Sequence, residues 1–420
     1  MDDATGEVLW STIYGPSIWH ETAYSMALDS QGNILVAGRV FSEETLDDLL
    51  LLRFDGNDGS LDWAFEYDGS DSLDDRAWSL VLDSSDNAYV TGSSAWENGD
   101  VSFLTMKINS QGQEVWRRLE PGAVNNQTRA GWVDLDPLGM PVIANRTWTS
   151  ESSYDVFLRK YSSSDGSTLW ESGYNGPTSS SDDLRDMTLD SEGNILVTGV
   201  SNSDFMVLKF AGNGDLLWDT RYDGPPGWYD LGNRVTWTPM GEVVATGFSD
   251  GGDSSWDAFT LGVDESDGSI AWELRLDGSD GLTDEGQVLF YDENTADLFV
   301  GGYSYSYQTD MDQLLIRYSL AETAVPGMDA FTRLRAWPNP SAGEFHFSLS
   351  LEQDRSLDLA VYDLRGRRVR HWDGMNLQHG DQQFTWDGKD SRGRDLPSGV
   401  YFLRASGFPE LRSPALVILR

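Results

Sequence analysis

The sequence predicts an all-β protein, a six-bladed β-propeller closed by an N-terminal strand and followed by a C-terminal Ig-like β-sandwich. Three observations lead to this prediction: a tryptophan recurs every 48 to 54 residues, a glycine keeps the same spacing, and the balance of charge changes near residue 325. The recurring tryptophans are Trp10, Trp63, Trp116, Trp170, Trp218 and Trp272. Self-similarity at a fixed period of this length is the signature of a repeat architecture.

Each repeat resolves into four short strands, as residues 77–82, 87–92, 48–54 and 60–67 illustrate for the four positions. β-Branched and aromatic residues alternate in these runs, and Gly, Asn, Asp and Ser bound them. The turns between the first and second strands suit tight hairpins, because Gly and Asn tolerate positive φ. Four antiparallel strands in about fifty residues are what a propeller blade requires.

The two ends of the repeat region complement each other. Complete units begin near Glu21, Asp75, Thr128, Asp182 and Asp230, whereas a sixth unit from Asp284 has only three strands and ends at 319. Residues 1–12 supply a lone fourth strand. We therefore expect this strand to pair beside residues 314–318 and to close the ring, so that residues 1–319 form the propeller.

Several segments resemble a known repeat family. Residues 174–177 (Tyr-Asn-Gly-Pro), 182–183 (Asp-Asp), 190–199 (Asp-Ser-Glu-Gly-Asn-Ile-Leu-Val-Thr-Gly) and 204–209 are similar to the bacterial SBBP β-propeller repeat, and the strand order resembles NHL-type blades. The third copy departs most, with Asn145 in place of the recurring glycine. The resemblance implies a fold and a cell-surface location but no reaction.

Residues 320–330 break the period and are interpreted as a linker, and short alternating strands in 331–420 suggest an Ig-like sandwich. The segments 337–340 (Trp-Pro-Asn-Pro), 361–367, 386–390 (Trp-Asp-Gly-Lys-Asp) and 396–402 resemble the type A sorting domain of the type IX secretion system. They resemble the Ig-like domain of FlgD-type hook-capping proteins equally well, and 386–390 favours the latter. The first resemblance implies a sorting motif and secretion machinery as a partner; its residues are Pro338, Asn339, Pro340, Gly366, Gly399 and Tyr401.

Composition limits the location and the partners. The chain has no cysteine, so disulfides and thiolate metal sites are excluded, and no apolar run is long enough to span a bilayer. Residues 325–420 hold 13 basic and 12 acidic residues, which leaves 16 basic and 57 acidic residues in 1–324. This acidic body argues against binding nucleic acid or an anionic membrane. We expect a secreted or cell-surface bacterial protein whose leader precedes Met1 or was trimmed, because the chain begins within a repeat.

The connections between strands assign a binding face. The connections between the second and third strands, and between successive repeats, are long and variable, and in antiparallel blades both emerge on one face. Variable loops on a rigid scaffold are where binding usually resides. Aromatic residues in these loops are candidates for stacking on a glycan or on protein side chains, unless they only cover the rim of their own blade: Trp19, Trp96, Trp148, Trp228, Tyr229, Trp256, Tyr305 and Tyr307.

Carboxylates recur in register at the start of the first strand, and five of them around one pore mouth would suit Ca²⁺, which prefers oxygen ligands. These candidate metal ligands are Glu21, Asp75, Asp182, Asp230 and Asp284. The alternative is that each caps a turn or bonds a neighbouring backbone group, which their repetition favours. A second set of aspartates begins the third strand and is interpreted as scaffold: Asp48, Asp155, Asp204, Asp257 and Asp312.

The leading functional hypothesis is therefore a surface scaffold that binds an extracellular glycan or protein, with no required cofactor other than possible Ca²⁺. Catalysis finds little support, because His20 is the only histidine before the C-terminal module and no phosphate-binding glycine loop is present. Two alternatives stay open: an extracellular hydrolase or lyase with a metal-assisted site at the pore mouth, and a structural surface-layer component. The fold alone does not choose among them.

Overall fold

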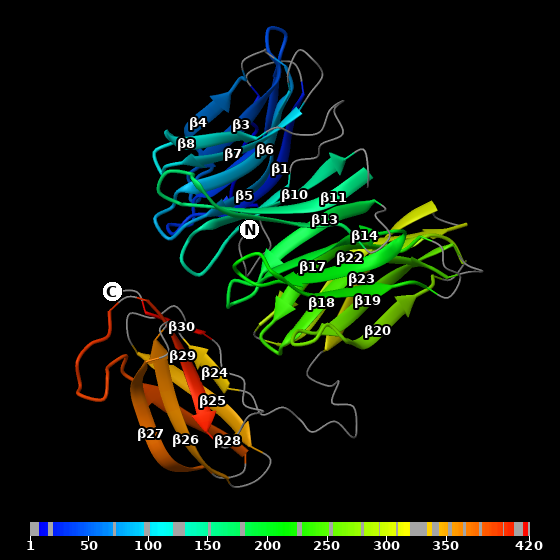
Figure 1. Ribbon diagram of the computed structural model, residues 1–420. Helices are drawn as coiled ribbons and strands as arrows, with labels where there is room; N and C mark the ends of the chain where they lie inside the picture. The colour runs from blue at the N-terminus through cyan, green and yellow to red at the C-terminus, as the bar shows by residue number, and fades with distance from the viewer. Residues whose placement is uncertain are drawn as a thin grey trace. The chain divides into compact units, whose positions relative to one another are not determined.

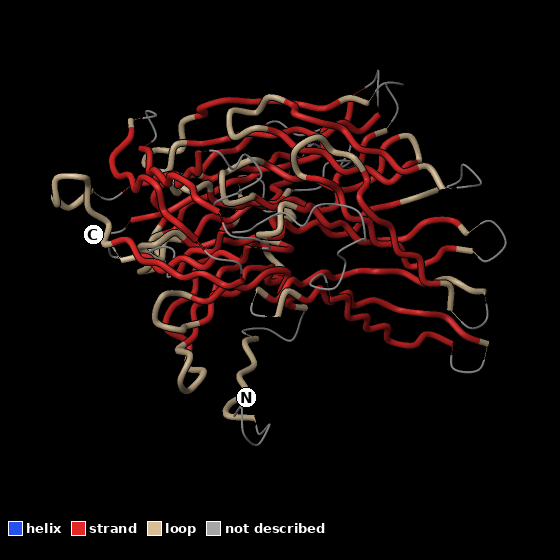
Figure 2. The backbone as a smooth tube through the Cα atoms, turned by 90° about the horizontal axis from the view of Figure 1, so that it is seen from below, coloured by secondary structure: helices blue, strands red, loops and turns tan. Residues whose placement is uncertain are grey.

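The computed structural model of the chain (Figure 1) consists of strands joined by turns and loops (Figure 2). It describes residues 8–15, 20–69, 73–95, 101–120, 131–149, 153–176, 181–224, 229–251, 255–278, 281–293, 295–307, 310–319, 334–337, 344–351, 355–363, 367–377, 380–397, 399–406 and 415–418. No helix occurs in these ranges, so they also contain no helix that could cross a membrane. The all-β prediction is confirmed.

The chain divides into two compact units, Met1–Tyr291 with Leu298–Arg317, and Asp292–Asp297 with Tyr318–Arg420. We number the sheets of residues 21–319 from 1 to 6 in chain order. Their strands are as follows: sheet 1, β1 (Glu21–Leu28), β2 (Ile34–Ser42), β3 (Leu46–Phe54) and β4 (Leu61–Tyr67); sheet 2, β5 (Asp75–Leu82), β6 (Ala88–Ala95), β7 (Val101–Ile108) and β8 (Glu114–Glu120); sheet 3, β9 (Trp132–Leu135), β10 (Pro141–Thr149), β11 (Ser153–Tyr161) and β12 (Thr168–Tyr174); sheet 4, β13 (Asp182–Leu189), β14 (Ile195–Ser201), β15 (Asp204–Phe210) and β16 (Leu216–Tyr222); sheet 5, β17 (Leu231–Thr238), β18 (Glu242–Asp250), β19 (Trp256–Asp264) and β20 (Ile270–Leu276); sheet 6, β21 (Asp284–Asp292), β22 (Asp297–Ser306) and β23 (Asp310–Ser319).

Sheets 1 to 5 are four-stranded antiparallel meanders in which each strand pairs with the next along the chain. Such sheets are typical of propeller blades. Their apolar faces pack between neighbours, because one buried cluster joins Leu51 of sheet 1 to Met106 of sheet 2 and another joins Leu158 of sheet 3 to Leu208 of sheet 4. The prediction of propeller-type sheets is confirmed, and the number of blades in a closed ring stays a prediction.

The recurring glycine lies opposite a β-bulge in the first strand of its sheet. In sheet 4 the register between β13 and β14 shifts between Leu184 and Asp186, directly opposite Gly199. A Cβ atom on Gly199 would lie 2.0 Å from the Asp183 carbonyl oxygen, so no larger residue fits there. In sheet 3 the glycine of this close contact lies before the first strand instead of in the second strand. It is Gly131, where a Cβ atom would collide with Ala144 and Asn145. This exchange accounts for the departure of the third copy.

In sheets 1 to 4 the recurring tryptophan joins its sheet to the next. The indole N–H of Trp116 donates to the Ser163 carbonyl of sheet 3 at 3.2 Å, and that of Trp218 donates to the Glu265 carbonyl of sheet 5 at 3.0 Å. In these two junctions the ammonium of the preceding third-strand lysine, Lys107 or Lys209, donates to the same carbonyl. The period of the tryptophans thus reflects one bond that the junctions from sheet 1 to sheet 5 repeat, whereas the buried indole nitrogen of Trp272 has no such partner among the described residues.

The basic residue near the end of the third strand also binds the first hairpin of its own sheet. Arg53 pairs with Asp29 at 2.7 Å, and Lys160 pairs with Asp136 at 2.6 Å. Burial alone would raise the pKa of Asp29, but hydrogen bonds from Asn33, Arg53 and the turn backbone lower it to about 2. These contacts hold the third strand to the first hairpin of its sheet.

The N-terminal segment uses the same junction bond as the complete sheets. The indole N–H of Trp10 donates to the Gly56 carbonyl in the hairpin between β3 and β4 at 2.9 Å, and the Thr12 hydroxyl donates to the Gly59 carbonyl at 2.6 Å. Trp10 therefore stands where the tryptophan of a preceding sheet would stand. Residues 8–15 form no strand in the described part of the chain, so pairing with β23 and ring closure stay predictions.

The C-terminal module is a sandwich of two sheets. One has the order β24 (Leu334–Trp337), β25 (Phe345–Leu351), β28 (Gly380–Trp386); the other has the order β27 (Arg368–Leu377), β26 (Arg355–Asp363), β29 (Gly399–Ser406), β30 (Ala415–Ile418). Trp386 is 1% exposed and stacks on Phe345, while Val361 and Leu403 join the same core from the second sheet. The Ig-like prediction is confirmed.

Candidate carboxylate clusters and an aromatic surface

The aspartates at the start of the first strands share one contact, which we call the Asp–Gly clasp. Each accepts a hydrogen bond from the backbone N–H of the glycine six residues earlier, in the connection from the preceding sheet. All four aspartates are at least 99% buried. The pairs and their N···O distances are Gly69–Asp75 at 2.5 Å, Gly176–Asp182 at 2.7 Å, Gly224–Asp230 at 2.9 Å and Gly278–Asp284 at 2.6 Å.

The clasp explains why glycine and aspartate recur at these two positions. A Cβ atom on Gly69 would lie 2.8 Å from the Ser94 hydroxyl and 3.0 Å from the Asp75 carboxylate, so the connection needs glycine to approach the strand. Burial raises the pKa of Asp75 to about 6, and the negative charges of Asp68 and Asp48 add to the rise, while bonds from Ser94 and Gly69 oppose it. The capping alternative to a metal ring therefore accounts for the repetition of these aspartates.

The five predicted metal ligands do not share one ligand set in the described residues. Carboxylate oxygens close enough to hold one ion occur there in two other groups of three, and in each group the three oxygens lie within 4.8 Å of one another. We call Asp48, Asp68 and Asp75 the first cluster, and Asp257, Asp277 and Asp284 the second cluster. Asp75 and Asp284 thus meet acids of the preceding sheet, while Glu21, Asp182 and Asp230 belong to neither cluster.

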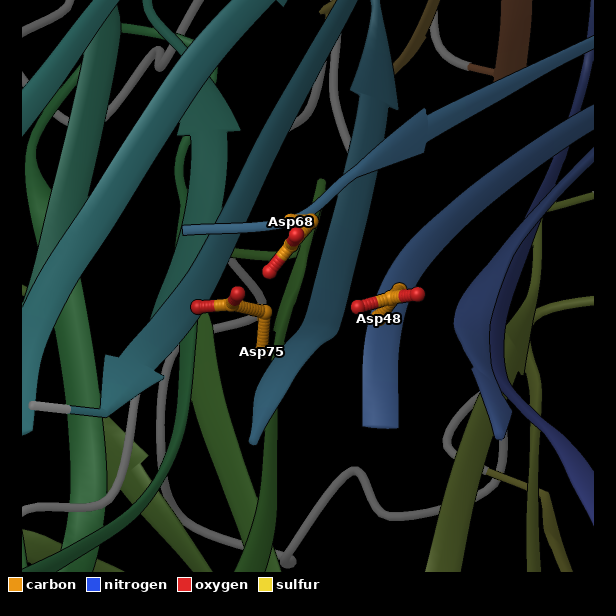
Figure 3. Close-up of side chains that lie close together, drawn as sticks. All are labelled: Asp48, Asp68 and Asp75. Atoms are coloured by element: carbon orange, nitrogen blue, oxygen red, sulfur yellow. The ribbon is translucent and has the colours of Figure 1, made fainter. Parts of the chain in front are cut away.

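The first cluster lies at the junction of sheets 1 and 2 (Figure 3). Asp48 comes from β3, Asp68 follows β4, and Asp75 begins β5. Asp48 and Asp75 are buried, whereas Asp68 is exposed. Burial raises the pKa of Asp48, and the charges of Asp68, Glu66 and Asp47 raise it further, against a hydrogen bond from Thr45. The carboxylates are therefore close enough to repel one another.

The second cluster occupies the equivalent place between sheets 5 and 6, but it contains an internal cation. The Arg275 guanidinium pairs with the Asp257 carboxylate at 2.8 Å and also donates to the Ser249 hydroxyl at 2.6 Å. The side chain of Asp257 is 1% exposed, so this ion pair neutralises a buried charge.

Two of the predicted aromatic residues meet on one exposed surface. Trp256 begins β19 and stacks on Phe248 of β18, with ring centroids 4.4 Å apart and planes at 17°. Tyr229, just before β17, lies 5.9 Å from the same ring. Tyr229 and Trp256 are each 38% exposed, whereas Phe248 is buried. We call these three residues the aromatic surface; the strand residue Phe248 joins it although no loop pattern marked it.

The other predicted aromatic residues lie elsewhere or outside the described part of the chain. Tyr305 of β22 packs edge-on against Tyr303 at 5.6 Å, and Tyr307 after the same strand is 80% exposed. Trp148 lies in β10, but its side chain is outside the description. Trp19, Trp96 and Trp228 are outside the described residues.

The predicted sorting motif is described only in part. Pro338, Asn339, Pro340 and Gly366 lie outside the described residues, and Gly399 begins β29. Tyr401 is 4% exposed, and its hydroxyl donates to the Pro397 carbonyl at 2.9 Å. This tyrosine therefore has a core role in the sandwich.

Sequence reasoning missed Asp68 and Asp277 and interpreted Asp48 and Asp257 only as scaffold. The available signal was the Asp-Gly pair that follows the fourth strand, at 68–69, 223–224 and 277–278. The sequence does not show that this turn lies beside the third strand of its own sheet and the first strand of the next sheet, so the pair could not be assigned to a cluster.

Comparison with known families agrees with both predicted modules. The model of the SBBP β-propeller repeat matches residues 176–205, and the model of the FlgD Ig-like domain matches residues 338–408. The search of curated proteins found no match.

Similar solved structures include BamB from Moraxella catarrhalis, at 13% identity and a TM-score of 0.38, with 82% of this chain and 83% of that chain covered. They also include PorZ, a surface component of the type-IX secretion system of Porphyromonas gingivalis, at 12% identity and a TM-score of 0.43. That match covers 95% of this chain and 51% of the PorZ chain, so this chain spans about half the length of PorZ.

Proposed function

We propose that this protein is a secreted or cell-surface propeller scaffold that binds an extracellular glycan or protein through its long-loop face. The observation that carries the proposal is the aromatic surface, where Trp256 and Tyr229 are each 38% exposed around the buried ring of Phe248. A ring that is already stacked loses little conformational freedom when a ligand covers its open side.

Two further features support a ligand at this place. Tyr229 lies in the connection before β17 and Trp256 at the start of β19, so both belong to the connections assigned to one face. The Arg185 charge opposes the rise that burial causes in the pKa of Tyr229, and Arg185 pairs with Asp183 at 3.6 Å. Polar groups beside an aromatic plane are the usual composition of a specific binding site.

A glycan array probed with the full chain and with Trp256→Ala tests the proposal. We expect the substitution to weaken binding at least about tenfold, as removal of a central aromatic anchor does. Tyr24→Ala is the matched control, because Tyr24 of sheet 1 is 37% exposed and packs at a tilt against Trp78 of sheet 2. Equal loss in both variants, or an unchanged profile for Trp256→Ala, would contradict the assignment.

The same proposal gives residues 331–420 a sorting or anchoring role. The match to an Ig-like module and the buried core around Trp386 support an independent carrier domain. Export of an unrelated cargo fused to residues 331–420 in a host with type IX secretion tests the sorting role, and cargo retained in the periplasm would contradict it.

A further inference from the structure

We propose that the first cluster, Asp48, Asp68 and Asp75, binds one Ca²⁺ ion at the junction of sheets 1 and 2. The three carboxylates come from β3, from the connection after β4 and from the start of β5. Two sheets that are consecutive in the chain thus contribute to one oxygen cluster. This site is separate from the aromatic surface and does not depend on the ligand proposed there.

The three carboxylates lie close enough together to hold one Ca²⁺ ion. Oxygen ligands lie about 2.3–2.6 Å from Ca²⁺, so two ligands on opposite sides of the ion are at most about 5 Å apart. In the first cluster one oxygen of each carboxylate lies within 4.8 Å of the other two. Mg²⁺ requires near-ideal octahedral geometry at about 2.1 Å and loses its waters reluctantly, so carboxylates already fixed on two sheets favour Ca²⁺. Water can complete the coordination, because Asp68 is on the exposed side of the cluster.

Two buried oxygens at this place have no hydrogen-bond partner. They are Oδ1 of Asp48 and Oδ1 of Asp75, whose residues are 7% and 1% exposed. The second oxygen of each carboxylate is held, by the Thr45 hydroxyl for Asp48 and by the Gly69 N–H for Asp75. Buried polar atoms without partners are costly and therefore rare. The carboxylates are thus fixed in place with one oxygen each available to an ion, and Figure 3 shows them grouped with Asp68.

No basic side chain compensates Asp48 or Asp75 in the described part of the chain. Arg39 and Arg76 both pair with Asp47, and Arg76 also pairs with Asp74. Arg53 pairs with Asp29 and Asp62. Arg117 lies over the ring of Tyr67 and pairs with Glu114 at 3.4 Å. Burial and neighbouring carboxylates raise the pKa of Asp48, which agrees with a cluster that lacks a cation.

The residue of sheet 1 that is equivalent to the compensating arginine of the second cluster can be identified from the strand register. Arg275, which pairs with Asp257 in the second cluster, lies three residues after the recurring Trp272 and pairs in register with Phe259. The equivalent residue in sheet 1 is Glu66, which lies three residues after Trp63 and pairs with Leu50. An acid thus replaces the compensating base, and a bound divalent cation would supply the charge that Arg275 supplies in the second cluster.

Thermal unfolding of the full chain, freed of metal and then titrated with CaCl₂, tests the proposal. We expect 10 mM Ca²⁺ to raise Tm by about 3–5 °C, as a site with Kd on the order of 0.1–1 mM would do by mass action. Equal MgCl₂ should give a clearly smaller shift. Asp68→Asn should remove at least two thirds of the calcium effect, because Asp68 is exposed and its substitution leaves the clasp of Asp75 intact.

Asp277→Asn is the matched control, because Asp277 holds the place of Asp68 in the second cluster. It should keep the full calcium shift. A second variant, Asp48→Asn, keeps the contact with Thr45 and should lose the shift as Asp68→Asn does. A wild-type Tm that does not respond to 10 mM Ca²⁺ would overturn the proposal, as would equal loss of the shift in Asp68→Asn and Asp277→Asn.

Discussion

The junction of sheets 1 and 2 and the junction of sheets 5 and 6 place three aspartates in the same arrangement, but they balance the charge differently. In the second cluster Arg275 pairs with Asp257 at 2.8 Å. In the first cluster Glu66 stands at the equivalent position and its charge raises the pKa of Asp48. The Asp–Gly clasp therefore fixes one carboxylate of each cluster, Asp75 or Asp284, and one residue outside the clasp decides whether the charge is compensated internally.

The junction of sheets 3 and 4 and the junction of sheets 4 and 5 carry less uncompensated negative charge than the first cluster does. Arg221, at the position of Arg275 in sheet 4, lowers by its charge the pKa values that burial raises at Asp182 and Asp204. At the junction of sheets 3 and 4, Asn175 replaces the acid that Asp68 supplies in the first cluster. One charge fewer, or one arginine more, is enough to remove the excess of negative charge that distinguishes the first cluster.

The largest expected effect comes from removing the internal cation with Arg275→Met. This change leaves the buried carboxylate of Asp257 without its partner and should lower the free energy of unfolding by about 2–4 kcal/mol in the absence of metal. The urea midpoint measured in EDTA checks the loss. Calcium should restore part of it, because the second cluster would then resemble the first.

Arg117→Met is the control for that prediction, since Arg117 is an exposed arginine whose pair with Glu114 spans 3.4 Å. Exposed pairs contribute about 0–1 kcal/mol, so its urea midpoint should change little. If Arg275→Met proves as stable as the wild type, the guanidinium does not compensate the cluster and the comparison between the two junctions fails.

A smaller effect on stability is expected from the hydrogen bonds that join the first strands of successive sheets. The accepting side chain of these bonds differs along the chain. Ser25 and Ser79 accept the Leu80 and Val133 N–H groups of the next sheets, whereas Asp186 accepts the Val235 N–H of sheet 5 at 2.9 Å. Burial raises the pKa of Asp186 to about 6, against the opposing charge of Arg234. The folded state therefore binds this proton more tightly than the unfolded state does.

The contribution of Asp186 should be fully present below about pH 4 and should decrease as the pH rises toward 6. Asp186→Asn keeps an oxygen acceptor for Val235 and does not titrate. Between pH 4 and 7 the wild type should therefore lose about 1–2 kcal/mol relative to the variant, since one pKa unit corresponds to about 1.4 kcal/mol and the side chain is only partly buried. Parallel urea midpoints for the two proteins would show that Asp186 carries no such proton.

Much of the fold was predictable because its repeating residues each satisfy a requirement that recurs. Gly199 must lie against a bulge, and Trp218 must reach a carbonyl of the next sheet, so their period appears in the sequence. The clusters were not predictable in the same way. Asp48 and Asp75 belong to different sheets, and sequence periodicity gives no distance between side chains across a junction.

The aromatic surface was predictable in part for a related reason. Alternation of the hairpins places the connections that hold Tyr229 and Trp256 on one face. Their shared contact with Phe248 depends on how β18 presents its side chain, which loop composition does not encode. Ring closure depends on residues 1–12 and β23, and it stays a prediction of the sequence.

Calorimetric titration of Glu66→Arg with CaCl₂ tests the central claim most directly, because it places the arginine of the second cluster into the first. We expect the variant to give no binding heat under conditions in which the wild type binds one Ca²⁺. We also expect the metal-free variant to melt at a higher temperature than the metal-free wild type. Calcium binding by Glu66→Arg with the stoichiometry and affinity of the wild type would contradict the account.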